Sequence, residues 1–415
     1  MGLIDKMNEF KVAQAVSMHV PGHKNKTIGN LNEIELSFDM TEIPGLDNLH
    51  SPTEVLKELN NKLSKKYEGY YAQALVNGST TGILSGLHSL YTNDSTIYVV
   101  GEAHKAIYHA AELLGTTVIE VPLKALLKAG LKPSDIVVFT YPSYSGEIFD
   151  ISSYIEFVQS KDAKVLIDEA HGAHFDITPR FPQSALNFSP NIVVQSYHKG
   201  LPSLTGSSVI FVKDKDIHRK VMKYIDIFET SSPSYLSLLS IESGHAFYEE
   251  YDDEVFFLMR ESLLHTLKAN GIEVKEVADP AKLILKKEGT TPYELEWLFR
   301  EKHIYSEMTT DDGVLWCLPL WHDGDIFPFE LLLERINVLN LKSESNIRKP
   351  KKKMDVSVLK GKKAVRKIVP YPPGVPIMHE GEIFTPSRLE VIMQHRENNV
   401  KIEGLEDNLD YYTER

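Results

Sequence analysis

A lysine stands just after a short apolar run. The run at 192–196 reads IVVQS, and Lys199 follows it with a histidine and small residues around it, in the order Ser196-Tyr197-His198-Lys199-Gly200. Lysine is seldom buried without a purpose. Its charged end could snorkel to the surface, or partial desolvation could make the amine nucleophilic toward a carbonyl group. At this point a surface lysine and a Schiff-base lysine are both open.

An acidic residue closes a second apolar run. Residues 164–168 read KVLID, and Asp168 leads into Glu169-Ala170-His171-Gly172-Ala173-His174. A carboxylate is costly to bury unless it meets a cation or a proton donor. Metal ligation by Asp168, His171 and His174 is an alternative, but no further ligand cluster stands out and Gly172 disfavours a rigid helical pair. We therefore expect a cationic partner for Asp168 and no metal.

A loop of small residues follows a third apolar run, AQALV at 72–76. The loop, Asn77-Gly78-Ser79-Thr80-Thr81-Gly82, offers hydroxyls, backbone N–H groups and a helix N-terminus to a phosphate. Alone it is common turn chemistry. Ligands of open α/β sheets bind at the carboxyl ends of strands. The loop, the carboxylate and the lysine together match pyridoxal phosphate, which needs a phosphate cradle, an anion opposite its pyridine nitrogen and an amine for its aldehyde.

The elements that must position these residues alternate between short apolar runs and helical patterns. This alternation predicts an α/β fold with a mostly parallel sheet and helices on both faces. The first helix is expected to start at a capping box in which Ser51 is the N-cap, Pro52 follows and Glu54 lies three residues on. Seven strands are predicted, at 72–76, 96–100, 117–121, 135–140, 164–168, 192–196 and 208–212.

The rest of the chain suggests a second, smaller α/β unit. Helices are expected at 103–114, 152–160 and 234–268, and the pattern restarts after Asn270-Gly271 with further strands and helices. We predict an N-terminal arm at 1–50, a large cofactor-binding domain at 51–265 and a small C-terminal domain at 266–415. The basic stretch 348–367 is expected to be a linker within the last of these.

Composition excludes several classes of protein. With 415 residues, 42% hydrophobic and 25% charged, the chain is not disordered or fibrous. A single cysteine, Cys317, fits a reducing, cytoplasmic setting, and no apolar run reaches 18 residues, so no membrane span is expected. The 348–367 stretch lacks interleaved aromatics, which favours a solvated linker over nucleic-acid binding. The net charge of −13 is compatible with a cationic substrate.

With these motifs in place, the chain resembles the fold-type I pyridoxal-phosphate enzymes, which share the aspartate-aminotransferase-like fold, and within them the Orn/Lys/Arg decarboxylase family. The PGHK, LDNL and YPPG segments carry the family assignment. The resemblance rests on nine segments: 19–24, 41–49, 78–80, 103–105, 141–144, 168–172, 196–199, 230–235 and 370–374.

The resemblance implies a role for each matching residue. Lys199 would bind the cofactor aldehyde, Asp168 would pair with the pyridine N–H, and His104 would stack on the ring. His171 would lie near the ring hydroxyl. The phosphate would be bound by Ser79, Thr80, Ser196 and His198, and by Thr230 and Ser231 of the neighbouring subunit. An obligate homodimer with shared active sites is therefore expected.

The resemblance also implies a reaction. A basic amino acid (arginine, lysine or ornithine) would lose carbon dioxide to give a polyamine or its precursor, with Lys199 or His104 returning a proton to the α-carbon. Asp47 and Glu382 are candidates for the cationic end of the substrate. The chain would be a short form without the family's N-terminal regulatory domain. The alternatives are an aminotransferase, a carbon–carbon lyase and an inactive cofactor-binding protein.

Replacing the carboxylate tests this interpretation. Asp168→Ala should cost several kcal/mol of transition-state stabilisation, because the anion that keeps the pyridine nitrogen protonated is lost. The measurement is kcat of the purified variant with its amino-acid substrate. An unchanged kcat would remove Asp168 from the cofactor site.

Overall fold

The computed structural model describes residues 2–41, 43, 45–339, 356–371, 375–397 and 400–405. It contains two compact units. The first comprises Met1–Gly101 and Ala106–Leu341, and the second comprises Glu102–Lys105 and Lys342–Arg415.

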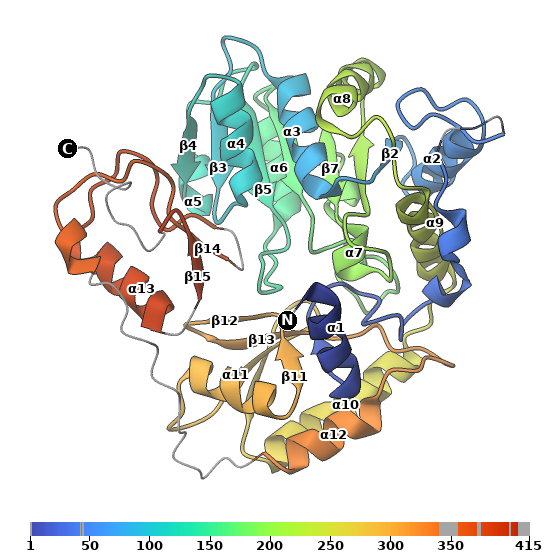
Figure 1. The fold of residues 1–415 in the computed structure, drawn as a ribbon. Helices are drawn as coiled ribbons and strands as arrows, with labels where there is room; N and C mark the ends of the chain where they lie inside the picture. The colour runs from blue at the N-terminus through green and yellow to red at the C-terminus, as the bar shows by residue number, and fades with distance from the viewer. Residues whose placement is uncertain are drawn as a thin grey trace. The chain divides into compact units, whose positions relative to one another are not determined.

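A seven-stranded sheet forms the centre of the first unit (Figure 1). Its order is β2-β8-β7-β6-β5-β3-β4, and all pairs are parallel except the two that β8 makes. Because β8 is antiparallel to both neighbours, β2 runs parallel to β7. The carboxyl ends of β2, β3, β5, β6 and β7 therefore share one edge. The strands are β2 (Tyr71–Leu75), β3 (Ile97–Val100), β4 (Val118–Val121), β5 (Ile136–Thr140), β6 (Lys164–Asp168), β7 (Ile192–Gln195) and β8 (Ser208–Val212).

The composition of the central strands explains their position. β7 and β8 are buried at every residue, as expected for Val- and Ile-rich strands that are covered on both faces. The seven predicted strands and their fold class are confirmed. Helices α3 (Gly78–Leu90), α4 (Lys105–Leu113), α6 (Ile151–Gln159) and α8 (Lys215–Phe228) accompany the sheet, and the helical stretch expected at 234–268 is two helices, α9 (Tyr235–Glu250) and α10 (Glu254–Ala269).

The predicted start of the first helix after the arm is wrong. Helix α2 (Val55–Lys65) has Glu54, not Ser51, as its N-cap. Asp47 explains the difference, because its carboxylate accepts the backbone N–H groups of Thr53 (2.8 Å) and Glu54 (2.6 Å). These residues are held in a turn before the helix begins, so Ser51 cannot cap it.

A second sheet lies in the same unit. It is antiparallel, with the order β12-β13-β10-β9, and the N-terminal β1 (Val16–Met18) pairs separately with β11 (Ile304–Ser306). The seven-stranded sheet and this second sheet share one continuous hydrophobic core, in which Phe211 and Trp316 are fully buried. The other elements are β9 (Glu273–Glu276), β10 (Lys282–Lys286), β12 (Met308–Thr310), β13 (Gly313–Cys317), α1 (Leu3–Val12), α5 (Leu123–Leu126), α7 (Tyr197–Gly200), α11 (Pro292–Glu301) and α12 (Phe329–Asn337).

This shared core bears on the expected domain boundary. The division expected at 265/266 falls inside α10, whereas the compact units divide after Leu341. The physical reason is that the second sheet has no separate core of its own. The predicted strands and helices after Gly271 are nevertheless present.

The second unit has its own small core, which contains Leu359, Phe384 and Ile392. Its elements include β14 (Val369–Tyr371), α13 (Pro386–Glu397) and β15 (Lys401–Glu403). The linker expectation for 348–367 therefore differs from the structure over 356–367, which belongs to this unit. Residues 348–355 lie outside the described residues, as do 42, 44 and 372–374 of the family segments.

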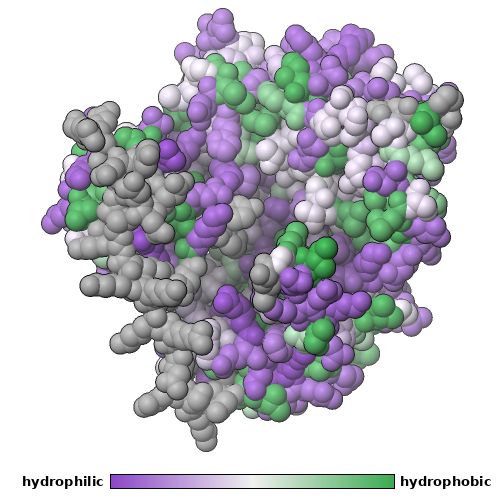
Figure 2. Space-filling model, viewed as in Figure 1, coloured by the Kyte–Doolittle hydropathy of each residue, from purple (hydrophilic) through white to green (hydrophobic). Residues whose placement is uncertain are grey.

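The surface adds two observations. Within the described part of the chain, the structure contains no helix with the length and apolar character that a bilayer crossing demands. On the face drawn in Figure 2, apolar side chains reach the surface over α1, where Leu3, Ile4 and Met7 are exposed.

The core makes a prediction about stability. Phe211 in β8 is fully buried and packs edge-on against Tyr67, with 5.8 Å between the ring centroids. Phe211→Ala should lower the free energy of unfolding by roughly 3–5 kcal/mol through lost burial and a residual cavity. Urea denaturation measures this loss against Phe38→Ala, since Phe38 is 41% exposed. Equal losses in the two variants would contradict the assigned core.

Candidate active site

The candidate site lies where strands of the large sheet end. The loops after β2, β5, β6 and β7 all leave the same edge, so residues distant in the sequence converge there. Asp168 is the last residue of β6, and Lys199 lies in the one-turn helix α7 directly after β7.

Lys199 is partly accessible and contacts a histidine. Its Nζ lies 3.1 Å from Nε2 of His171. Burial lowers the pKa of Lys199, and the charge of Lys282 acts in the same direction, whereas Asp168 and Glu307 oppose the change. A larger share of the amine is therefore neutral than for an ordinary lysine, and the neutral amine is the form that attacks a carbonyl group.

Asp168 is a buried carboxylate with few partners. It is 4% exposed, and its Oδ1 accepts the backbone N–H of Ala170 at 3.1 Å. Burial raises its pKa, while the charge of Lys199 counteracts this effect. A cationic N–H placed at this carboxylate would offset the cost of burying it.

Tyr144 and Glu307 also lie near Lys199. The Tyr144 ring lies 4.4 Å, centroid to centroid, from the ring of His171. Its hydroxyl donates to Glu307 Oε1 at 2.6 Å, and Glu307 Oε2 accepts the N–H of Val20 at 2.8 Å. Burial, followed by the charges of Lys199 and other nearby groups, keeps the pKa of His171 well below its usual range. His171 is therefore a neutral ring beside the amine.

The PGHK segment contacts the lysine turn through its main chain. Gly22 donates its N–H to the carbonyl of His198 at 2.7 Å. A Cβ at Gly22 would lie 2.5 Å from the carbonyl oxygen of Leu201, so no side chain fits there. Lys24 is buried, and its Nζ donates to the carbonyls of His19 (2.5 Å) and Cys317 (2.8 Å). The motif thus packs the N-terminal arm against α7 and β13.

The small-residue loop begins α3 as predicted. Gly78, with φ of +80°, donates its N–H to the carbonyl of Gly206 at 2.7 Å. A Cβ at Gly206 would lie 2.9 Å from the carbonyl oxygen of Val76, and φ there is +98°. Ser79 is half-buried and Thr80 is exposed, both in the first helical turn, where backbone N–H groups have no partner within the helix.

Two further predicted phosphate ligands lie beside the lysine. The hydroxyl of Ser196 is fully buried and has no hydrogen-bond partner among the described residues. His198 places Nδ1 3.0 Å from the carbonyl of Ser207. Burial, and to a lesser degree the charge of Lys199, lowers the pKa of His198 to about 4. At neutral pH it is therefore a neutral ring that can share hydrogen bonds.

The other predicted site residues come from segments away from the ends of β6 and β7. His104 lies between β3 and α4 and is half-buried, and Thr230 and Ser231 are exposed. Asp47 uses both carboxylate oxygens in the turn before α2. Glu382 lies in the second unit, where Oε2 accepts the N–H of His379 at 2.8 Å. Their proposed roles stay predictions.

Three residues of the site had no predicted role. Tyr144 was part of a family segment, Glu307 lies between the short strands β11 and β12, and Lys282 begins β10. Glu307 and Lys282 come from the part of the chain that was expected to form a separate domain. A lysine at the start of an apolar strand was the one signal that could have identified Lys282, whereas Lys199 was identified by its position after an apolar strand.

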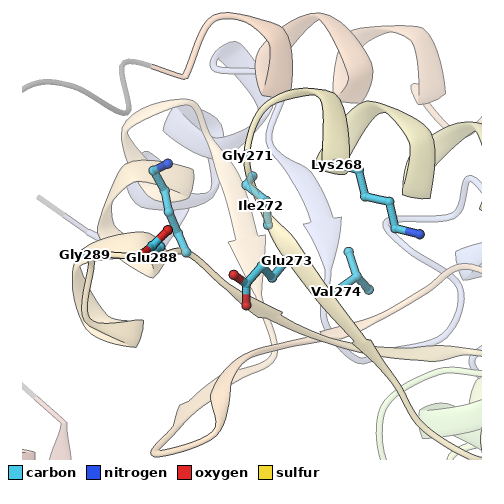
Figure 3. A pocket seen from close by; sticks show the side chains of 8 residues that line it. Lys268, Gly271, Ile272, Glu273, Val274, Glu288 and Gly289 are labelled. Carbon is cyan, nitrogen blue, oxygen red and sulfur yellow. The ribbon is translucent and has the colours of Figure 1, made fainter.

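Two other features of the structure bear on the site. In the described ranges no three His, Cys, Asp or Glu side chains are grouped to bind a metal ion, and His174 instead contacts Asp279 at 2.9 Å. A hollow of about 730 Å³ lies at the end of α10 and the start of β9 (Figure 3). Its lining residues, among them Lys268, Glu273 and Glu288, are not residues of the candidate active site.

Comparison with known proteins extends over almost the whole chain. Models of the Orn/Lys/Arg decarboxylase family match residues 116–269 (major domain) and 341–410 (C-terminal domain). The uncharacterized protein YaaO of Bacillus subtilis is 30% identical, in an alignment that covers 93% of each chain. An arginine decarboxylase of Halalkalibacterium halodurans is 25% identical, covering 95% of this chain and 93% of that protein.

Solved structures share the fold. The lysine decarboxylase LdcF of Francisella novicida superposes with a TM-score of 0.65 at 17% identity, over 88% of this chain and 72% of that one. A serine palmitoyltransferase of Sphingomonas wittichii gives a TM-score of 0.54 at 16% identity, over 68% and 74%. The expected fold class is thereby confirmed.

The buried lysine of the PGHK segment predicts a pH effect. Burial lowers the pKa of Lys24 from 10.5 to about 8. Between these values the unfolded chain binds a proton that the folded chain releases, so this group makes folding more favourable as pH rises. The free energy of unfolding of the natural protein minus that of Lys24→Met should increase by on the order of 3 kcal/mol from pH 8 to 10.5. Denaturant unfolding across this range measures it, with exposed Lys26→Met as the control. A constant difference would contradict a buried, destabilised ammonium group.

Proposed function

The chain belongs to the Orn/Lys/Arg decarboxylase family, and we propose that it removes the α-carboxyl group of a basic amino acid, releasing carbon dioxide and an amine. The observation that carries this proposal is the placement of Lys199, Asp168 and His171 at one sheet edge, with Lys199 Nζ 3.1 Å from His171. Arginine is the first substrate to test, because several similar proteins bear the name arginine decarboxylase.

The residues at this edge fit pyridoxal phosphate. Asp168 is a buried carboxylate whose pKa burial raises, so a pyridine N–H would give it a charged hydrogen-bond donor besides the N–H of Ala170. The buried, unpartnered hydroxyl of Ser196 is a free hydrogen-bond donor for a phosphate oxygen. The first turn of α3, with Ser79 and Thr80, supplies backbone N–H groups and a positive helix end. Lys199 supplies the amine.

Each of these residues has a task in the proposed reaction. Bound pyridoxal phosphate supplies an electron sink for the electrons that remain when carbon dioxide leaves. Asp168 would face the pyridine nitrogen as its counter-ion, and Lys199 would supply the amine that holds the cofactor aldehyde. The same Lys199 amine could carry a proton to the α-carbon. His104 remains the alternative donor.

Neutral histidines suit this site. The pKa of His171 lies well below its usual range because of burial and neighbouring cations. A neutral ring beside Lys199 can accept a hydrogen bond from the amine without adding a positive charge. His171 therefore orients the amine, and the Tyr144 ring packed on it limits its motion.

The cationic end of the substrate needs an anion. Asp47 and Glu382 remain proposed for this contact, and the structure adds Glu307 as a half-buried carboxylate whose charge acts on Lys199. We place Glu307 first among the three, because it shares the surroundings of Lys199. Its hydrogen bonds to Val20 and Tyr144 fix its position without neutralising its charge.

The proposal includes a homodimer that works in the cytoplasm and makes a polyamine or its precursor. Thr230 and Ser231 are exposed in this chain, as hydroxyls that reach a neighbouring subunit must be. Light scattering of the purified protein measures the mass, and a monomer that is fully active would remove the shared site from the proposal.

Product analysis tests the reaction. Protein reconstituted with pyridoxal phosphate is offered arginine, lysine and ornithine separately, and the products are identified by mass. One dominant amine with carbon dioxide is expected, whereas a keto acid would indicate amino transfer. Lys199→Ala should abolish turnover, while Lys220→Ala, which removes an exposed lysine of α8, should leave it unchanged. Normal turnover in Lys199→Ala would overturn the proposed function.

A further inference from the structure

Lys282, the first residue of β10, is a buried lysine to which the proposed reaction gives no task. It is 3% exposed, and its Nζ donates to the carbonyl of Tyr144 at 2.7 Å. It lines one small cavity together with Lys199, His171, His174 and Asp279. A lysine from the second sheet therefore lies in the immediate surroundings of the proposed cofactor lysine.

Tyr144 connects the two lysines. The Nζ atoms of Lys282 and Lys199 lie 5.8 Å and 5.9 Å from the centroid of its ring. The same ring packs on His171, which contacts the Lys199 amine. A displacement of Tyr144 would consequently change the positions of His171 and of the Lys199 amine.

Asp279 and His174 line the same cavity as Lys282. Asp279 is fully buried, its Oδ1 lies 2.9 Å from His174 Nε2, and it accepts the N–H of Ala281 at 3.0 Å. Burial raises the pKa of Asp279, but His174 and Lys282 outweigh burial and hold it below the ordinary value. The Asp279 anion thus balances the buried Lys282 charge. The Asp279 N–H also donates to the carbonyl of Gly146 at 3.1 Å, which fixes the Tyr144 loop a second time.

We propose that Lys282 is a positioning residue for Lys199: it fixes the loop of Tyr144, on which His171 packs, and it places a second positive charge in the cavity that Lys199 lines. The inference rests on the proposed function in one respect, namely that Lys199 is the cofactor lysine. It assigns a task to the second sheet, which supplies Lys282 and Asp279.

The other groups around Lys199 set the sign of the effect. Asp168 from β6, Glu307 from the segment between β11 and β12, and Cys317 from β13 raise the pKa of Lys199. Burial and Lys282 lower it, and neutral His171 is in contact with the amine. Removing the charge of Lys282 leaves the two carboxylates less opposed, so Lys199 would hold its proton to higher pH.

The test uses the full chain with substitutions at one position. Lys282→Met removes charge and hydrogen bond, Lys282→Gln keeps a donor without charge, and Lys282→Arg keeps both. Lys286→Met is the matched control, because Lys286 is an exposed residue of the same strand. Thermal unfolding shows which variants are folded.

Two readouts report on Lys199 without depending on turnover. The first is the pH midpoint of the visible absorption of pyridoxal phosphate bound to the reconstituted protein. The second is the rate at which trinitrobenzenesulfonate labels Lys199 at pH 8 in protein freed of cofactor, read from the mass of the peptide that contains Lys199. A kcat and KM comparison completes the set.

Lys282→Met should move the absorption midpoint to higher pH and slow labelling of Lys199 on the order of tenfold, because the charged amine does not react. Its kcat should fall more than its KM changes. Lys282→Arg and Lys286→Met should behave as the natural protein does. Lys282→Gln should shift both readouts as the Met variant does.

Other results would overturn the inference. Equal midpoints and labelling rates in Lys282→Met and Lys286→Met would show that Lys282 does not act on Lys199. If Lys282→Met does not fold, unchanged readouts in Lys282→Gln would refute the effect of charge. A failure of the proposed function is distinguishable, because it would appear as unchanged visible absorption in Lys199→Ala, whatever happens at residue 282.

Discussion

The burial of two opposite charges at the same sheet edge is the constraint on which the rest of the structure depends. Asp168 ends β6 and Lys199 lies in the turn after the neighbouring β7, and each lowers the cost of burying the other. Neither charge is tolerable in an apolar interior without such compensation. The large parallel sheet provides this arrangement because adjacent parallel strands deliver their last residues to the same edge. The surrounding loops then modify the pKa of each of these two groups.

Much of the fold could be predicted because its central strands are continuous apolar runs of strand length. β7 and β8 illustrate this, since every one of their residues is buried and β-branched residues dominate. The start of α2 could not be predicted, because Asp47 competes for the N–H groups that a capping box would use. Local sequence cannot reveal such competition between segments. The expected domain boundary and the division into compact units differ for a related reason, since a restart of the strand pattern does not show whether two sheets share one core.

The site was predictable to the extent that its residues follow strands of the large sheet. Lys199, Asp168, His171 and Ser196 meet this condition, and the structure brings them together at the predicted edge. Tyr144, Glu307 and Lys282 belong to the same surroundings, but Lys282 comes from the second sheet and Glu307 from the segment that leads into it. Their positions depend on how that sheet packs, which no spacing in the sequence encodes. Electrostatic neighbours contributed by tertiary packing are thus the part of a site that sequence patterns describe least.

The contact of Gly22 with the turn of Lys199 has a consequence for the order of assembly. Gly22 leaves the ribosome long before residue 198, yet its N–H finds its acceptor on the carbonyl of His198. The N-terminal arm must therefore wait, without this partner, until most of the large sheet has been synthesised and folded. Docking of the arm completes the surroundings of the lysine. Uptake of the cofactor would accordingly report that the N-terminal arm has docked on the turn of Lys199.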